Sequence, residues 1–140
     1  MTQDDKDLLL QDLCARLPYG VKVESVFINT DSKKRKSCGI EVFDATCILM
    51  IRDGFGEFKP YLFPLSSITE GQKNQISQLL LDAKIEFPPY EEDYDNLLAS
   101  SVKQANALIN YCLANHLDIN GLIEKGIAIE APKDMYKNQQ

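Results

Sequence analysis

The sequence predicts an α+β fold made of an N-terminal helix, a small antiparallel β-meander of three to four strands, and C-terminal helices. Apolar residues repeat at helical spacing near the N-terminus and again after residue 69, whereas residues 21–65 carry strand-like runs separated by turn residues. Elements segregated along the chain in this way are typical of the α+β class. A length of 140 residues allows one hydrophobic core. We therefore expect a single domain over 1–140, with a polar tail that frays from about residue 133.

The first helix is expected near residues 4–17. Its apolar residues follow an i, i+3, i+4, i+7 spacing, which defines one buried stripe of Leu10, Leu13, Cys14 and Leu17. Pro18 ends this helix, because proline disfavours the helical conformation of the residue before it.

Residues 21–30 are expected to form the first strand. The alternation of polar and apolar residues breaks at Val26–Ile28, which indicates either burial on both faces or a β-bulge. The polar segment that follows contains four consecutive basic residues, Lys33 to Lys36, and we expect it to form a hairpin loop.

The second strand-like run, Ile40–Arg52, is long, and Asp44–Ala45 marks a point at which it divides. Glu57–Leu65 is expected to add a short last strand. Pro60 and Pro64 would confine that strand to an edge of the sheet, because proline has no N–H to donate to a neighbouring strand.

A second helix is predicted from Thr69, where the spacing to Gln72 forms a capping box, to about Lys84. A long helix follows at about 96–116, capped by Asp93 or Asp95. One face of this long helix carries a stripe made of Leu98, Val102, Ala105, Ile109, Cys112, Leu113 and His116.

A short final helix is predicted from its cap at Asp118 through Lys125. Gly126 suits the left-handed position after a helix end, with Ile127 packing back on Leu122.

Composition excludes several classes of function. The net charge of -6 and the pI near 4.7 oppose nonspecific binding to nucleic acid. The longest apolar run, Cys47–Ile51, is far shorter than the roughly 20 residues of a membrane span. The acidic, polar start of the chain is not a secretory signal, so we expect a cytoplasmic protein with four reduced cysteines, Cys14, Cys38, Cys47 and Cys112. The single histidine and the scattered cysteines predict no metal site and no cofactor.

Two groups of residues raise acid–base chemistry as a hypothesis. His116 is the single imidazole in the chain, and its place on an apolar helix stripe favours a packing or capping role over catalysis. The acidic segment Glu91–Asp95 holds the densest group of carboxylates, but its spacing does not match a calcium loop. We interpret that segment as a solvated loop that caps the following helix.

Two further groups raise binding as a hypothesis. Lys33–Lys36 could contact phosphate or a nucleic-acid backbone, although no glycine-rich cradle accompanies the run. Aromatic residues between 55 and 63 are candidates for a partner-binding surface, with closure of the core as the favoured alternative; they are Phe55, Phe58, Tyr61 and Phe63.

Three stretches carry a family resemblance: residues 6–21 around DLCARLPYGV, residues 59–70 with KPYLFPLSSITE, and residues 115–132 around NGLIEKGIAIEAP. Together they resemble a group of short uncharacterised proteins from gut-anaerobe bacteria and their prophages or other mobile elements. The resemblance implies a cytoplasmic, phage-linked setting. It implies no activity, so it assigns no catalytic residue.

These observations favour a non-enzymatic interaction or accessory protein with an as yet unknown protein partner. A nucleic-acid-associated regulator that uses Lys33–Lys36 is one alternative. An enzyme whose site residues are dispersed along the sequence is the other, because such residues need only meet in space.

Overall fold

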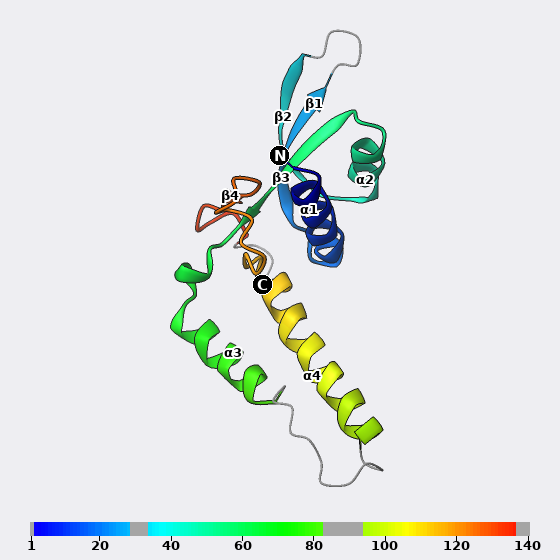
Figure 1. Ribbon diagram of the computed structural model, residues 1–140. Helices are drawn as coiled ribbons and strands as arrows, with labels where there is room; N and C mark the ends of the chain where they lie inside the picture. The colour runs from blue at the N-terminus through cyan, green and yellow to red at the C-terminus, as the bar shows by residue number, and fades with distance from the viewer. Residues whose placement is uncertain (1, 29–33, 83–93, 137–140) are drawn as a thin grey trace. The chain divides into compact units, whose positions relative to one another are not determined.

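The computed structural model describes residues 2–28, 34–82 and 94–136, and its elements are labelled in Figure 1. The described chain divides into two compact units. Unit 1 comprises residues 1–65 and 116–140, and unit 2 comprises residues 66–115. Unit 1 is therefore discontinuous in sequence. The α+β class, the N-terminal helix and a C-terminal helix are confirmed.

Unit 1 contains a four-stranded mixed sheet, and its strand order β2-β1-β3-β4 places β1 and β3 in the centre. The strands are β1 (Lys22–Ile28), β2 (Arg35–Val42), β3 (Gly56–Leu62) and β4 (Ile129–Glu130). β1 pairs antiparallel with both β2 and β3, whereas β3 and β4 are parallel. The sheet is therefore not a simple meander, because the chain places β3 beside β1 and not beside β2.

A β-bulge interrupts the pairing of β1 with β2. Ser25 is opposite Gly39 and Val26 is opposite Ser37, so β2 contributes one extra residue at this point. The irregularity lies beside the broken alternation at Val26, but the extra residue belongs to β2, so the predicted bulge in the first strand is wrong.

β3 is a central strand, so its predicted place at an edge is wrong. Pro60 is opposite Val23 of β1, and the pairing with β4 begins only at Tyr61. The short β4 explains how proline is tolerated here, because position 60 faces no residue of β4 in the ladder.

The first helix, α1 (Gln3–Ala15), begins with a capping box in which Thr2 and Asp5 each bond to the other's backbone. A turn of 3-10 helix follows at Leu17–Tyr19, and another occupies Leu65–Ser67. The buried face of α1 is rotated from the predicted stripe. It consists of Leu9, Asp12, Leu13 and Arg16, whereas Cys14 is exposed.

The predicted strand Ile40–Arg52 is wrong beyond residue 42, because Ala45–Arg52 forms helix α2. Asp44 provides the cause: its side chain accepts a hydrogen bond from the Cys47 N–H at 3.2 Å and so begins a helix. The division expected at Asp44–Ala45 is real, but it separates a strand from a helix.

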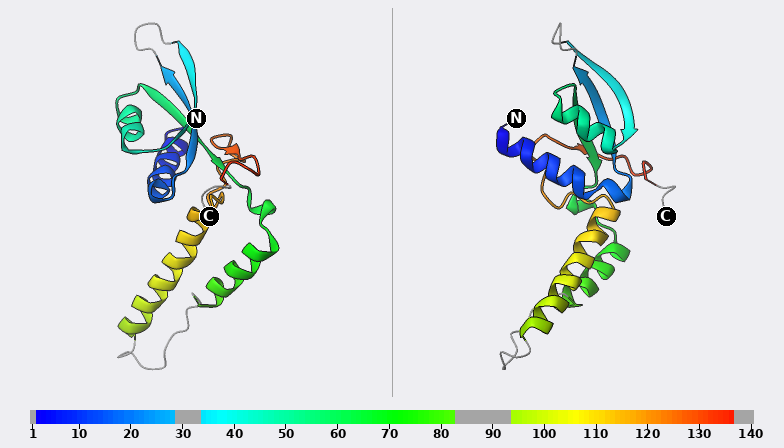
Figure 2. Two further views of the ribbon diagram at one scale, coloured as in Figure 1. Left: turned by 180° about the vertical axis from the view of Figure 1, so that it is seen from behind. Right: turned by 90° about the vertical axis from the view of Figure 1, so that its right-hand side faces the viewer.

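The core of unit 1 lies between the sheet and two helices that cover one of its faces, as Figure 2 shows. Leu13 of α1 is fully buried against this core, as is Val23 of β1. Phe43 and Phe58 meet edge to face, with ring centroids 6.1 Å apart. Both helices and the sheet thus share one apolar layer.

Residues 116–128 form a series of turns, and the short helix predicted from Asp118 through Lys125 is absent from this described segment. Gly126 does adopt the expected left-handed conformation, with φ +77°, and Ile127 donates to the Leu122 carbonyl at 3.0 Å. Tyr136 is only 7% exposed, so the chain is anchored up to this residue and the predicted fraying is wrong for residues 133–136; the rest of the predicted tail lies outside the described residues.

Unit 2 is a helical hairpin of α3 (Glu70–Asp82) and α4 (Tyr94–Ala114), which run antiparallel to each other (Figure 1). The predicted capping box is confirmed, since Thr69 and Gln72 exchange hydrogen bonds of 3.1 and 3.2 Å. α4 begins at Tyr94, so Asp95 lies within the helix and is not its cap. Asp93, the other predicted cap, and most of the acidic segment lie outside the described residues.

Candidate functional site

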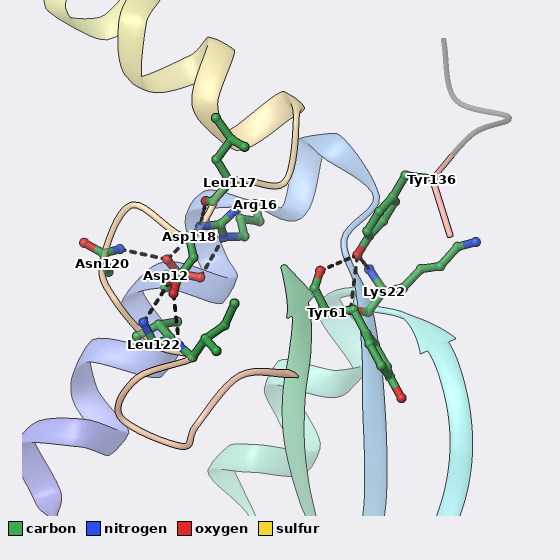
Figure 3. Close-up of polar contacts among 10 residues, drawn as sticks. Asp12, Arg16, Lys22, Tyr61, Leu117, Asp118, Asn120, Leu122 and Tyr136 are labelled. Atoms are coloured by element: carbon green, nitrogen blue, oxygen red, sulfur yellow. Dashed lines mark hydrogen bonds and ion pairs between the residues drawn. The ribbon is translucent and has the colours of Figure 1, made fainter. Parts of the chain in front are cut away.

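A buried ion pair fixes α1 to the C-terminal segment of unit 1. The Arg16 Nε donates to Asp12 Oδ2 at 2.7 Å, and both side chains are fully buried. Arg16 Nη2 also donates to the Leu117 carbonyl at 2.7 Å, and Asn120 donates to Asp12 Oδ1 at 2.7 Å (Figure 3). The pair therefore joins segments about a hundred residues apart in sequence.

Asp118 organises the loop that follows. Its carboxylate oxygens accept the Leu122 N–H at 2.8 Å and the Ile123 N–H at 3.0 Å. The carboxylate is almost fully buried, and these bonds satisfy it within the loop itself. Asp118 is thus a turn-forming residue.

Tyr136 holds the end of the described chain against two strands. Its hydroxyl accepts the Lys22 N–H at 2.9 Å and donates to the Tyr61 carbonyl at 2.7 Å (Figure 3). Burial raises the pKa of the Tyr136 phenol to about 12. Its ring stacks on His116 with the centroids 3.6 Å apart, and Lys22 Nζ donates to the Met135 carbonyl at 2.8 Å.

These contacts bring together the three stretches that carry the family resemblance. The backbone N–H of Phe63 in the second stretch donates to the His116 carbonyl of the third at 2.8 Å. The backbone N–H of Asp118 donates to the Phe63 carbonyl at 2.9 Å. Arg16 of the first stretch reaches the same segment through Leu117. We interpret this junction as structural, because the polar groups that form these hydrogen bonds are buried and bonded to one another.

His116 lies in this junction, with 3% of its surface exposed. Its φ of +58° is a left-handed conformation, uncommon for a residue other than glycine. Burial and the stack on Tyr136 favour the packing role expected for this histidine.

The four aromatic candidates do not form one surface. Phe58 is a core residue with 3% exposure, and Phe63 packs edge to face on Tyr136. Tyr61 is half-buried, and Phe55 is 40% exposed in the turn between α2 and β3. Phe58 therefore closes the core, as the favoured alternative predicts. Phe55 is the most exposed of the four side chains.

The basic run does not form a single loop tip. Arg35 and Lys36 belong to β2, Lys34 is exposed immediately before it, and Lys33 lies outside the described residues. The strand therefore begins inside the run, five residues before its predicted start at Ile40, and the predicted loop is wrong for Arg35 and Lys36.

One cavity of about 430 Å³ opens in unit 1 between the helices and the sheet. Its apolar lining includes Leu9 and Leu10 of α1, and its charged lining residues are Lys6, Glu24, Glu57 and Lys59. The described lining contains no serine, cysteine or histidine, so it offers no hydroxyl or thiol nucleophile and no imidazole base.

Burial limits the reactivity of Cys47. Burial raises the pKa of the Cys47 thiol to about 11, and its Sγ lies 3.7 Å from Glu41 Oε1. Cys14 is exposed on α1 and Cys112 is buried on α4, whereas the side chain of Cys38 lies outside the description. In the described part of the chain, no group of His, Cys, Asp and Glu side chains is arranged to hold a metal ion.

Helix α4 in unit 2 carries an exposed apolar face. We use the name apolar stripe for Leu98, Val102, Ala105 and Ile109, which fall within about 60° of one another around the helix at 100° per residue. The sequence predicts this face, but Leu98, Val102 and Ile109 remain 50, 51 and 45% exposed. On α3, Leu80 and Leu81 are 54 and 69% exposed.

Comparison of the chain with models of protein families, with curated proteins and with solved structures gives no match. Within residues 2–28, 34–82 and 94–136, no helix combines the length and the apolar character that crossing a membrane requires.

Proposed function

We propose that this chain is a non-enzymatic interaction protein that acts in the cytoplasm as an accessory component, and that the apolar stripe of α4 is its binding surface. The partner would present a complementary apolar helical surface. The resemblance to short proteins of gut-anaerobe bacteria and their prophages supports a phage-linked setting for this role.

The exposure of the apolar stripe carries the proposal. Three of its four side chains are large, aliphatic and about half exposed on one side of a single helix. Isolated apolar side chains are normal on protein surfaces, but a contiguous apolar face is typical of an interaction site.

The charge pattern of α4 supports the same conclusion. Charged residues make up 26% of the chain, which would place about five in a segment of twenty. Residues 96–115 contain only one, Lys103. Depletion of charge is a property of the centres of protein–protein interfaces, whereas solvated helices carry charge on their outer faces.

Site-specific photo-cross-linking in the native host tests this proposal. A benzophenone amino acid replaces Val102 or Ile109 within the apolar stripe. Matched controls carry it at Lys103 or Asn110, which are exposed and lie one residue further, turned by about 100° around the helix.

We expect discrete protein adducts from positions 102 and 109 and none from positions 103 and 110. Equal adducts from all four positions would indicate random collision and contradict the proposal. The absence of any adduct from positions 102 and 109 would also contradict it.

A further inference from the structure

We propose that the occupant of the apolar stripe is a second copy of this chain, so that two α3–α4 hairpins pair about a two-fold axis into a four-helix bundle. This inference rests on the proposed function, since it names the partner of the same surface.

The spacing of the apolar stripe matches the seam of a helical bundle. Positions 98, 102, 105 and 109 are separated by 4, 3 and 4 residues. These separations average about 3.7 residues, close to the 3.6 residues of one helical turn, which keeps the four side chains on one face over about three turns. α3 does not cover the whole seam, because Leu98, Val102 and Ile109 stay exposed beside it. Another helix is therefore required to fill it.

The same spacing is palindromic, which favours an identical partner. When two copies of α4 run antiparallel about a two-fold axis, position 98 of one copy is opposite position 109 of the other, and position 102 is opposite position 105. Leu98 then meets Ile109 at the two ends, and Val102 meets the small Ala105 near the axis. Every member of the apolar stripe contacts another member, as a self-complementary two-fold interface requires.

The charge distribution permits two copies to approach at this surface. The whole chain carries -6, which opposes self-association in general. Helices α3 and α4 contain two lysines and three carboxylates, so their summed charge is only -1; these residues are Lys73, Lys103, Glu70, Asp82 and Asp95. Like-charge repulsion between copies is therefore small along the two helices themselves, whereas residues 83–93, which join them in sequence, add a net charge of -3.

The size of the hairpin sets the expected strength. Helices of 13 and 21 residues are about 20 and 32 Å long, and two side by side are about 20 Å wide. The projected face is therefore roughly 500 Å² per copy, compared with about 800 Å² per partner in a standard interface. We expect a reversible dimer with a Kd on the order of 10 μM, in the range of weak association.

Sedimentation velocity of the purified full chain between 1 and 200 μM tests the proposal. The mass should rise with concentration from 15.8 kDa toward twice that value. Val102→Lys should raise the dimer Kd at least 30-fold. The control Asn110→Lys introduces the same charge outside the apolar stripe and should change Kd less than 3-fold. Circular dichroism verifies that each variant keeps its helices.

A charge pair tests the antiparallel geometry. Leu98→Lys and Ile109→Glu should each weaken the dimer, because each places a charge opposite an apolar side chain. The double variant should dimerise more tightly than either single variant, because the two-fold axis brings the opposite charges together twice.

Failure of this inference can be told from failure of the proposed function. If the chain stays monomeric at 200 μM while position 102 still forms an adduct with another protein, the proposal that the partner is a second copy is wrong and the proposed function stands. If neither dimer nor adduct forms, both are wrong. A dimer that Val102→Lys leaves intact uses another surface, which overturns the inference.

Discussion

Removing one member of the Asp12–Arg16 pair should destabilise unit 1 strongly. Asp12→Ala leaves the Arg16 guanidinium charged in a site from which solvent is excluded. It also removes the acceptor of the Asn120 amide. Breaking a buried ion pair on one side costs about 3–5 kcal/mol, and we expect a loss of unfolding free energy in this range. Arg16→Met should cost a similar amount, because Asp12 then becomes the unpaired charge.

The double variant Asp12→Ala/Arg16→Met should cost much less than the two single variants together. It removes both charges and replaces them with apolar side chains, which is often close to neutral in a buried site. Arg16 Nη1 is already buried with no hydrogen-bond partner among the described residues, so the native pair is not fully satisfied. The carbonyl of Leu117 loses its donor in the double variant, so we expect a net cost of about 1–2 kcal/mol.

Urea unfolding followed by far-UV circular dichroism measures these changes, and hydrogen exchange at β1 amides reports on unit 1 alone. A cost below about 1 kcal/mol for Asp12→Ala would refute the reasoning, because it would mean that the charge reaches solvent without disrupting the fold. Strictly additive single costs in the double variant would refute it as well, since groups in direct contact are expected to couple.

Three other perturbations have defined outcomes. The Tyr136 phenol keeps its proton to about pH 12 in the folded chain but loses it near pH 10 in the unfolded chain. The free energy of unfolding should therefore fall by about 2–3 kcal/mol between pH 10 and 12. Tyr136→Phe should remove this part of the pH dependence in urea titrations. In native alkylation at pH 8, only about one Cys47 thiol in a thousand is ionised, so mass spectrometry should show Cys14 modified first, and all four cysteines should label after denaturation without a reductant. Duplex DNA should bind no more tightly than about 0.1 mM near physiological salt; submicromolar binding that is lost when Lys33–Lys36 are all changed to alanine would instead favour a nucleic-acid regulator.

Local sequence signals predicted much of the fold. The capping box at Thr69 and the left-handed Gly126 both depend on short-range geometry, which neighbouring residues determine. The class of the fold followed from the order of such local elements.

The errors in the prediction came from long-range contacts. Apolar periodicity did not separate strand from helix in Ile40–Arg52, and the cap at Asp44 was the signal that could have done so. The buried face of α1 was mistaken because Asp12 and Arg16 are charged, and their burial depends on Leu117 and Asn120, far along the chain. The edge position predicted for β3 failed because its proline needed no partner from the short β4.

The candidate surface was only half visible in the sequence. Spacing identified the apolar stripe of α4 correctly, but spacing alone assigns such a face to the interior of the same chain. Whether a helix face is covered depends on what lies opposite, and the exposure of Leu98, Val102 and Ile109 required the structure.

The division of unit 1 into two sequence segments has a consequence for its synthesis. Residues 1–65 leave the ribosome before the 50 residues of unit 2, and residues 116–136 follow last. At about 5–20 residues per second, β4 and Tyr136 are synthesised roughly 3–15 s after β3. During that time the β4 side of β3 has no strand partner, and the Tyr61 carbonyl lacks the phenol that later binds it. The helical hairpin, whose contacts are local, can form in that interval. Unit 2 should therefore complete its structure before unit 1, although unit 1 begins first along the chain.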